Sequence, residues 1–191
     1  MAEHDSQPKT TGPGLHLLVL RCQAGDERAF ARLVAVYGPR TLGYLRGLVG
    51  DAAEDVQQEV WLAVYRGIAR LVNPSAFRTW LYRTTRHRAL DYLRKERRER
   101  ELIADVPMET AEVAAPEGEE PHVTEAMLEA LSKLGTAHRE VILLRYRDEM
   151  NYAEIALVVG CSIGTVRSRL HYAKQRLQEL AIQEGDRERI T

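Results

Sequence analysis

The segment from Tyr152 to Gln175 carries basic and hydroxyl side chains at spacings suited to DNA recognition. Four apolar residues recur there at helical spacing and would face inward: Val166, Leu170, Ala173 and Leu177. The outward side then presents the candidate DNA-binding residues Ser162, Thr165, Arg167, Ser168, Arg169, His171, Tyr172 and Lys174. Arginine can bond the paired acceptors of guanine in the major groove, and Ser, His and Lys can bond bases or phosphates. This pattern predicts a DNA-recognition helix.

A short apolar helix and a tight turn precede that helix. Ile155, Ala156 and Val159 share one side, and Gly160 supplies a permissive backbone that ends the helix. Ser162 is well placed to cap the following helix. Two helices joined in this way predict a helix-turn-helix motif. The alternative is a helical hairpin whose basic face is merely solvated.

A second group of side chains with nucleic-acid chemistry lies between Phe77 and Arg98. Eight Lys or Arg residues stand there against two acids, interleaved with aromatic, Thr and His side chains. Cations hold phosphates while rings stack on exposed bases, so the mixture suits a separated DNA strand. The competing interpretation is a solvated basic face with Trp80 and Tyr82 in the core.

The elements that must position these residues are helices throughout. The chain of 191 residues is predicted to be all-α, with two small helical domains and a linker between them. We expect a flexible tail over 1–14, a domain over 15–98, an acidic linker over 99–121, a helix-turn-helix domain over 122–180 and a tail over 181–191.

Charge supports that division. Residues 16–98 hold fifteen Lys and Arg against eight acids, whereas residues 99–121 hold one against eight. The linker also contains three prolines and no sustained periodicity, so it would let the domains adopt variable spacing. A near-neutral total charge therefore does not argue against nucleic-acid binding.

Within these domains the periodicity predicts individual helices. Residues 15–50 should form two helices, the second able to continue past Pro39; a third runs from Ala52 to Leu71. A fourth, from Ala76 to about Glu96, would bury Phe77, Leu81, Leu90 and Leu93. In the second domain, one helix follows Val123, Met127, Leu131 and Leu134, and the next follows Val141, Ile142, Leu144 and Arg145.

Other function classes find little support. Cys22 and Cys161 match no zinc or redox spacing, the histidines match no ligand motif, and there is no Gly-rich phosphate loop. We therefore expect no metal, no cofactor and no enzymatic activity. No apolar run is long enough to span a bilayer and the amino terminus lacks signal-peptide features, which favours a cytoplasmic protein.

Three segments, in order, resemble bacterial RNA polymerase sigma factors of the extracytoplasmic-function (ECF) type in the sigma-70 family. AEDVQQEVWLAVYR (53–66) is similar to the segment that docks on polymerase, and SAFRTWLYRTTRHRALDYLRKERR (75–98) to the segment that melts and reads the minus-ten element. LGTAHREVILLRYRDEMNYAEIALVVGCSIGTVRSRLHYAKQRLQEL (134–180) is similar to the domain that reads the minus-thirty-five element.

The resemblance implies partners and roles. The partners are core RNA polymerase, through the clamp helices of its largest subunit and the flap of its second largest, promoter DNA as duplex and as non-template single strand, and an anti-sigma factor. Polymerase docking would fall to Glu54, Asp55, Gln58, Glu59 and Trp61. Minus-ten binding would fall to Asn73, Arg78, Trp80, Arg83, Thr84, Arg86, His87, Arg88, Arg94 and Lys95. The connection from Leu71 to Ser75 would trap a base extruded from the non-template strand.

The sequence departs from the family pattern at three places. His87 stands where Asn is usual, Gly135 where Pro is usual, and Tyr172-Ala173-Lys174 where Arg-Ala-Arg is usual. Base preference at both promoter elements therefore cannot be transferred. A stand-alone helix-turn-helix regulator remains the main alternative function. We also hypothesise that the acidic linker covers the basic helix in the free protein.

Overall fold

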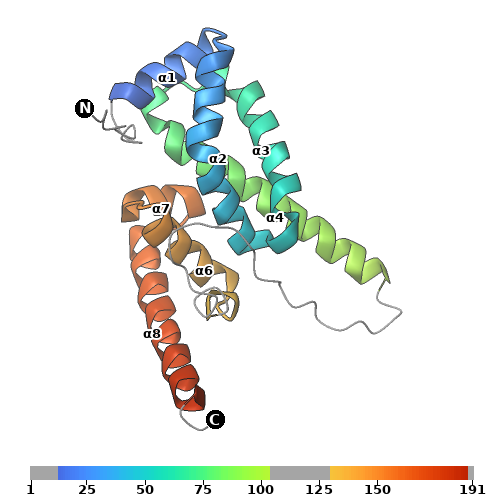
Figure 1. Cartoon of the computed structure of the whole chain (residues 1–191), viewed down its shortest axis with the longest axis vertical. Helices are drawn as coiled ribbons and strands as arrows, with labels where there is room; N and C mark the ends of the chain where they lie inside the picture. The colour runs from blue at the N-terminus through green and yellow to red at the C-terminus, as the bar shows by residue number, and fades with distance from the viewer. Residues whose placement is uncertain (1–12, 104–129, 189–191) are drawn as a thin grey trace, which may run out of the picture.

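The computed structural model describes residues 13–103 and 130–188, and every regular element in these ranges is helical (Figure 1). The amino-terminal part comprises α1 (Pro13–Gln23), α2 (Glu27–Val49), α3 (Ala53–Gly67) and α4 (Phe77–Ile103), with short 3-10 turns η1 (Gly50–Ala52), η2 (Ile68–Arg70) and η3 (Pro74–Ala76). The carboxyl-terminal part comprises α6 (Thr136–Ile142), the π-helical turn η4 (Leu143–Arg147), α7 (Tyr152–Val159) and α8 (Ile163–Glu188). The predicted all-α fold is confirmed.

Helix α4 runs further than predicted, and helix α2 runs through a proline. Helix α2 continues past Pro39, as the sequence allowed. Helix α4 extends to Ile103, beyond the predicted end near Glu96, and ion pairs one turn apart support the extension, including Arg97 with Glu101. Residues 99–103 therefore belong to a helix rather than to the linker. The rest of the predicted linker, and Val123 and Met127, lie outside the described residues.

The amino-terminal core forms where α2, α3 and α4 meet. Leu33, Val60 and Leu81 are completely buried there. Tyr37 and Phe77 pack edge to face with ring centroids 5.6 Å apart, and such burial and ring geometry are the main stabilising terms of a small helical bundle. The prediction was wrong for Leu90 and Leu93, which are half-buried because Tyr82, Thr85 and Ala89 occupy the inward face instead.

The helix-turn-helix is built as the sequence predicts. Gly160 adopts φ 72°, a left-handed conformation that ends α7 at little steric cost for glycine. Asn151 and Glu154 form a capping box at the start of α7: Asn151 Oδ1 accepts from the Glu154 amide at 2.9 Å, and Glu154 Oε2 accepts from the Asn151 amide at 2.8 Å.

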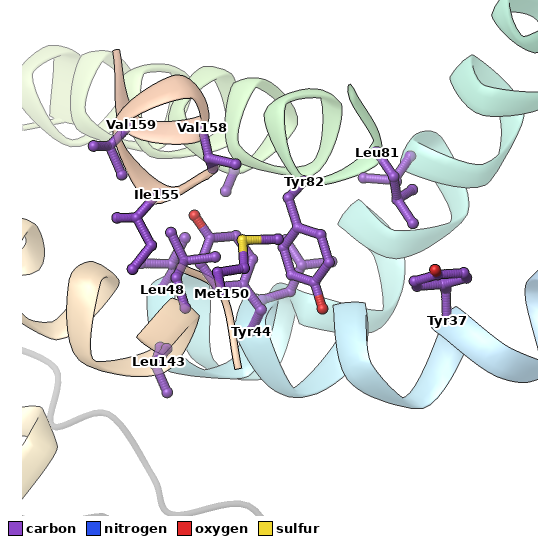
Figure 2. Close-up of a cluster of buried hydrophobic side chains, with 14 of the residues drawn as sticks. Tyr37, Tyr44, Leu48, Leu81, Tyr82, Leu143, Met150, Ile155, Val158 and Val159 are labelled. Carbon is purple, nitrogen blue, oxygen red and sulfur yellow. The ribbon is translucent and has the colours of Figure 1, made fainter. Parts of the chain in front are cut away.

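The two parts pack against each other, which the sequence did not predict. Tyr44, Leu48 and Tyr82 from the amino-terminal helices meet carboxyl-terminal side chains in one buried cluster (Figure 2). The labelled carboxyl-terminal members are Leu143, Met150, Ile155, Val158 and Val159. A continuous apolar core joins the two predicted helical domains, since burying these faces together removes apolar surface from water.

The capping box predicts the effect of a substitution. Replacing Asn151 by Ala removes the side-chain acceptor for the Glu154 amide, so the free energy of unfolding should fall by about 1 kcal/mol in denaturant titrations. Asn151→Asp retains an acceptor and should lie close to the unsubstituted protein. An equal loss in both variants would contradict the cap as the cause.

Candidate nucleic-acid interface

Helix α8 presents one apolar and one polar side, as predicted. Val166, Leu170 and Ala173 are buried against α7 and the rest of the core. Ser162 Oγ accepts from the Thr165 amide at 3.0 Å and caps the helix. The exposed candidates are Ser162, Arg167, Ser168, His171, Tyr172 and Lys174, whereas Thr165 and Arg169 are half-buried. The exposed row forms a polar helix surface of the kind that enters a major groove.

Aromatic rings beneath this row orient its cations. The guanidinium of Arg167 lies over the Tyr152 ring at 6.0 Å, and Arg145 lies over the same ring at 5.3 Å. Lys174 Nζ lies 5.2 Å from the centre of the Tyr146 ring, and hydrogen bonding to Tyr146 raises the pKa of Lys174, which keeps this lysine charged. The supporting roles of Tyr146 and Tyr152 were not predicted, because no spacing marks an aromatic residue outside helix α8 as a support.

The loop between α3 and α4 is held firmly and exposes its tip. Gln23 of α1 donates from Nε2 to the carbonyl oxygens of Ile68 at 3.0 Å and Leu71 at 2.8 Å. Asn73 Oδ1 accepts from the Ser75 amide at 3.0 Å and caps the turn that Pro74 begins. Val72, between these anchors, is 97% exposed. The fixed backbone thus exposes an apolar side chain, Val72, next to an amide side chain, Asn73.

Gln23 was also missed by the sequence analysis. A single polar residue on α1 carries no motif, and its role follows only from α1 packing against η2 and η3. His16 on the same helix makes a second contact to the loop, with Nδ1 3.1 Å from Ser75 Oγ. Helix α1 therefore acts as the support of the loop.

Most of the predicted strand-binding residues of α4 are accessible. Arg83, His87, Arg94 and Lys95 are exposed, and Thr84 and Arg88 are half-buried. Trp80 is half-buried, tilted against Phe77, and sits so close to Gly67 that a Cβ there would lie 2.9 Å from its ring. Next to it, a groove between α3 and α4 is lined by Leu62, Ala63, Gly67 and the side chains of Glu59, Arg66, Arg70 and Arg88. Arg66 and Arg70 thus add to the predicted basic surface.

Arg78 and Arg86 are placed differently from the prediction. Arg78 is buried, with only 8% of its surface exposed, and its guanidinium donates to the Asp148 carbonyl and lies 3.7 Å from Glu154 Oε1. Arg86 Nε donates to Glu140 Oε1 at 2.6 Å. Neither arginine is exposed in this arrangement, since the carboxyl-terminal part supplies acceptors that the pattern of one helix does not reveal; their predicted role toward DNA stays a prediction.

Helix α3 carries the residues predicted to dock on polymerase. Glu54, Asp55, Gln58 and Glu59 are exposed along it. Trp61 is half-buried and packs edge to face with Phe30 at 6.0 Å, and its indole nitrogen is buried without a partner among the described atoms. Leu62 and Tyr65 are the exposed apolar members of this face, at 54% and 58%. Acidic and apolar groups on one helix suit a partner helix that is both basic and apolar.

Two other kinds of site are not found in the described ranges. No cluster of three His, Cys, Asp or Glu side chains there could hold a metal ion. Over residues 13–103 and 130–188, no helix has both the length and the apolar character needed to cross a membrane.

Comparisons with known protein families agree with this geometry. Residues 33–99 match the family described as Sigma-70 region 2, and residues 124–177 match Sigma-70, region 4. The first range contains the loop and nearly all of α4, and the second contains the helix-turn-helix. Helix α1, which supports the loop, lies outside both matched ranges.

Individual relatives give the same result. The chain is 34% identical to the RNA polymerase sigma-H factor of Pseudomonas aeruginosa, with 85% of this chain and 91% of that protein covered. It is 33% identical to the ECF RNA polymerase sigma-E factor of Escherichia coli, with 84% and 91% covered. Among solved structures, the sigma factor RpoE in complex with the anti-sigma factor NepR from Bartonella quintana matches with a TM-score of 0.70 and 27% identity, covering 80% of this chain and 96% of that one.

The support of the loop by α1 can be tested directly. Gln23→Ala leaves two carbonyl oxygens without their donor, so amide hydrogen exchange over residues 68–76 should become faster. Gln57→Ala is the matched control, because that side chain donates to Gly38 in a contact away from the loop. Unchanged exchange in Gln23→Ala, or an equal change in Gln57→Ala, would contradict the assignment.

Proposed function

Because this chain belongs to the extracytoplasmic-function group of the sigma-70 family of RNA polymerase sigma factors, we propose that its two helical parts divide promoter recognition between duplex and single strand. The chain binds core RNA polymerase and directs promoter recognition and transcription initiation. The observation that supports the division is the pairing of an exposed recognition helix with an exposed, anchored loop beside a basic helix in one chain.

The carboxyl-terminal part reads duplex DNA in this proposal. Arg167 contacts base edges of the minus-thirty-five element from an early turn of α8, and Ser168, His171 and Lys174 contact neighbouring bases or phosphates. Ser162, Thr165, Arg169 and Tyr172 complete the surface. Tyr152 restricts the conformations of the Arg167 side chain before DNA arrives, which lowers the entropic cost of binding.

The amino-terminal part holds the separated non-template strand. The loop from Leu71 to Ser75 receives an extruded base, and its anchored backbone avoids an ordering cost on binding. Arg83, His87, Arg88, Arg94 and Lys95 hold phosphates along α4, and Trp80 offers a ring for stacking. Arg78 and Arg86 join them once their carboxylate partners leave.

Polymerase docking falls to α3. Glu54, Asp55, Gln58 and Glu59 face the basic clamp helices of the largest subunit, with Leu62 and Tyr65 as the apolar contacts beside Trp61. The carboxyl-terminal part contacts the flap of the second-largest subunit. An anti-sigma factor is the proposed inhibitor, since the solved sigma factor RpoE is in complex with the anti-sigma factor NepR; the similar chain CnrH is in complex with the cytosolic domain of CnrY. The protein acts where RNA polymerase acts, in the cytoplasm, and catalyses no reaction itself.

Run-off transcription with core polymerase on a library of promoter sequences tests the proposal. The chain should form a stoichiometric complex with core enzyme and start transcription at a subset of sequences sharing two separated elements. A stand-alone helix-turn-helix regulator would instead bind an operator without polymerase. Failure to associate with core enzyme in the absence of an inhibitor would reject the proposal.

The role of Arg167 predicts a change in specificity. Arg167→Ala should weaken binding to a cognate upstream element by about 1 to 3 kcal/mol and relax one base position, measured on the promoter library. Arg176→Ala is the control, because that arginine lies further along the same helix and pairs with Glu179 at 2.9 Å. A uniform loss across all sequences in Arg167→Ala would make it a phosphate contact instead.

A further inference from the structure

The polar side of α8 continues onto a neighbouring element. Tyr146 belongs to η4, outside the recognition helix, and 52% of its surface is exposed. Lys174, which is also exposed, lies on α8 with its Nζ 5.2 Å from the centre of the Tyr146 ring. A lysine of the recognition helix and a tyrosine of a different element therefore share one patch of surface.

The π-helical geometry of η4 explains how Tyr146 reaches this position. The Asp148 amide donates to the carbonyl of Leu143, five residues back, at 3.1 Å. A π turn holds more residues than an α turn and is frequent at functional sites. Leu143 and Leu144 are buried, and the next two residues, Arg145 and Tyr146, both reach side chains of the helix-turn-helix. The wide turn thus brings two successive side chains to the recognition surface.

Arg145 adds a second cation to the patch. Its Nη1 donates to the Met150 carbonyl at 2.9 Å, and its guanidinium lies 5.3 Å from the centre of the Tyr152 ring. A hydrogen bond with Tyr146 raises the pKa of Lys174, and the charge of Arg145 opposes this increase. Two cations and a hydroxyl are therefore close together, which favours an anion as their partner.

The hydrogen-bond chemistry of the pair leaves a hydroxyl donor for a ligand. An ammonium group has three donors and no acceptor, whereas a phenol hydroxyl has one donor and two lone pairs. In their hydrogen bond Lys174 must therefore donate, and the Tyr146 oxygen must accept. The hydroxyl hydrogen of Tyr146 cannot point back at the ammonium, so it is directed at another acceptor. The adjacent positive charge polarises this hydroxyl and makes it a stronger donor.

We propose that Tyr146 and Lys174 form a clamp for a single DNA phosphate beside the minus-thirty-five element, with the hydroxyl and the ammonium each donating to a non-bridging oxygen. This inference rests on the proposed function of α8 as the reader of duplex DNA. A phosphate presents two such oxygens and a negative charge, which match two donors and a cation. Tyr146 is thereby a DNA contact in addition to a support for Lys174.

The position of the clamp favours the DNA backbone over a base. The recognition helix of a helix-turn-helix contacts base edges mainly through its amino-terminal residues. Lys174 follows Arg167 by about two helical turns, and Tyr146 lies on an element outside α8. The clamp should therefore fix the register of α8 on the duplex and contribute no preference for a particular base.

A phosphate scan with core polymerase and the full-length chain tests the clamp. Each phosphate near the upstream element of an active promoter is replaced in turn by a methylphosphonate, which has no charge and one non-bridging oxygen. Promoter affinity is measured for the unsubstituted chain, Tyr146→Phe and Lys174→Gln. Replacing the clamped phosphate should weaken binding of the unsubstituted chain. This penalty should shrink in both variants, and at the same phosphate.

Tyr146→Phe separates a DNA contact from a support. Phenylalanine keeps the ring beside Lys174 and removes the hydroxyl, so binding to unmodified promoter DNA should weaken about three- to tenfold, the effect of one lost hydrogen bond. The loss should be equal across promoter sequences, and the salt dependence of the affinity should not change. Lys174→Gln should instead reduce the salt slope by about one.

Tyr92→Phe is the matched control. It makes the same chemical change on α4, outside the helix-turn-helix, where Tyr92 is half-buried. This variant should retain the full penalty at every phosphate of the upstream element. The melting temperature of Tyr146→Phe should stay close to that of the unsubstituted chain, because the side chain is exposed.

Three results would overturn the clamp. Unchanged affinity in Tyr146→Phe would leave Tyr146 as a support only, and a loss limited to particular sequences would make it a base contact. Penalties that shrink at different phosphates in Tyr146→Phe and Lys174→Gln would show two separate contacts. If the unsubstituted chain still directs polymerase to the upstream element, any of these results removes the clamp alone. If that chain does not associate with core enzyme, the proposed function itself fails.

Discussion

The packing of the two parts depends on which groups donate hydrogen bonds to two buried carboxylates, Glu140 and Asp148. Removing a carboxylate from water is costly unless hydrogen-bond donors replace the lost hydration. Across the junction between the two parts, Tyr44 and Arg86 donate to Glu140, and Tyr82 donates to Asp148. Apolar burial around Met150 and Ile155 has no direction of its own, whereas these hydrogen bonds require particular pairs of residues to face each other. The polar pairs therefore fix the arrangement that the apolar cluster stabilises.

Helix α4 consequently packs against both parts of the chain. Its inward residues Phe77, Leu81 and Ala89 complete the amino-terminal core, and its arginines are divided between solvent and the junction. Arginine suits both tasks, because its fixed set of donors binds a carboxylate as well as a phosphate. A lysine would supply the charge without the same geometry. The covered and the exposed cations of this helix thus differ in availability rather than in chemistry.

Sequence periodicity was sufficient to predict the helices and the polar face of α8. Val166, Leu170 and Ala173 face inward and Gly160 ends α7, because local spacing and turn chemistry decide both. Periodicity could not predict the contacts of Arg78 and Arg86, since their partners lie more than fifty residues away in the chain. In sequence, each partner carboxylate is indistinguishable from an ordinary surface acid. The loop contact of Gln23 was not predicted for the same reason. A single amide side chain forms no sequence pattern, and its partners are backbone oxygens outside its own helix. The roles of individual residues toward DNA remain predictions.

The two predicted DNA-binding surfaces differ in exposure. In this structure Arg167, Ser168 and His171 are exposed on α8. Arg78 and Arg86, in contrast, are held by acceptors of the same chain. Under the proposed function, this arrangement leaves Arg78 and Arg86 out of the cationic surface that is available to a separated strand. Arg83, Arg94 and Lys95 of α4 remain exposed in the same arrangement.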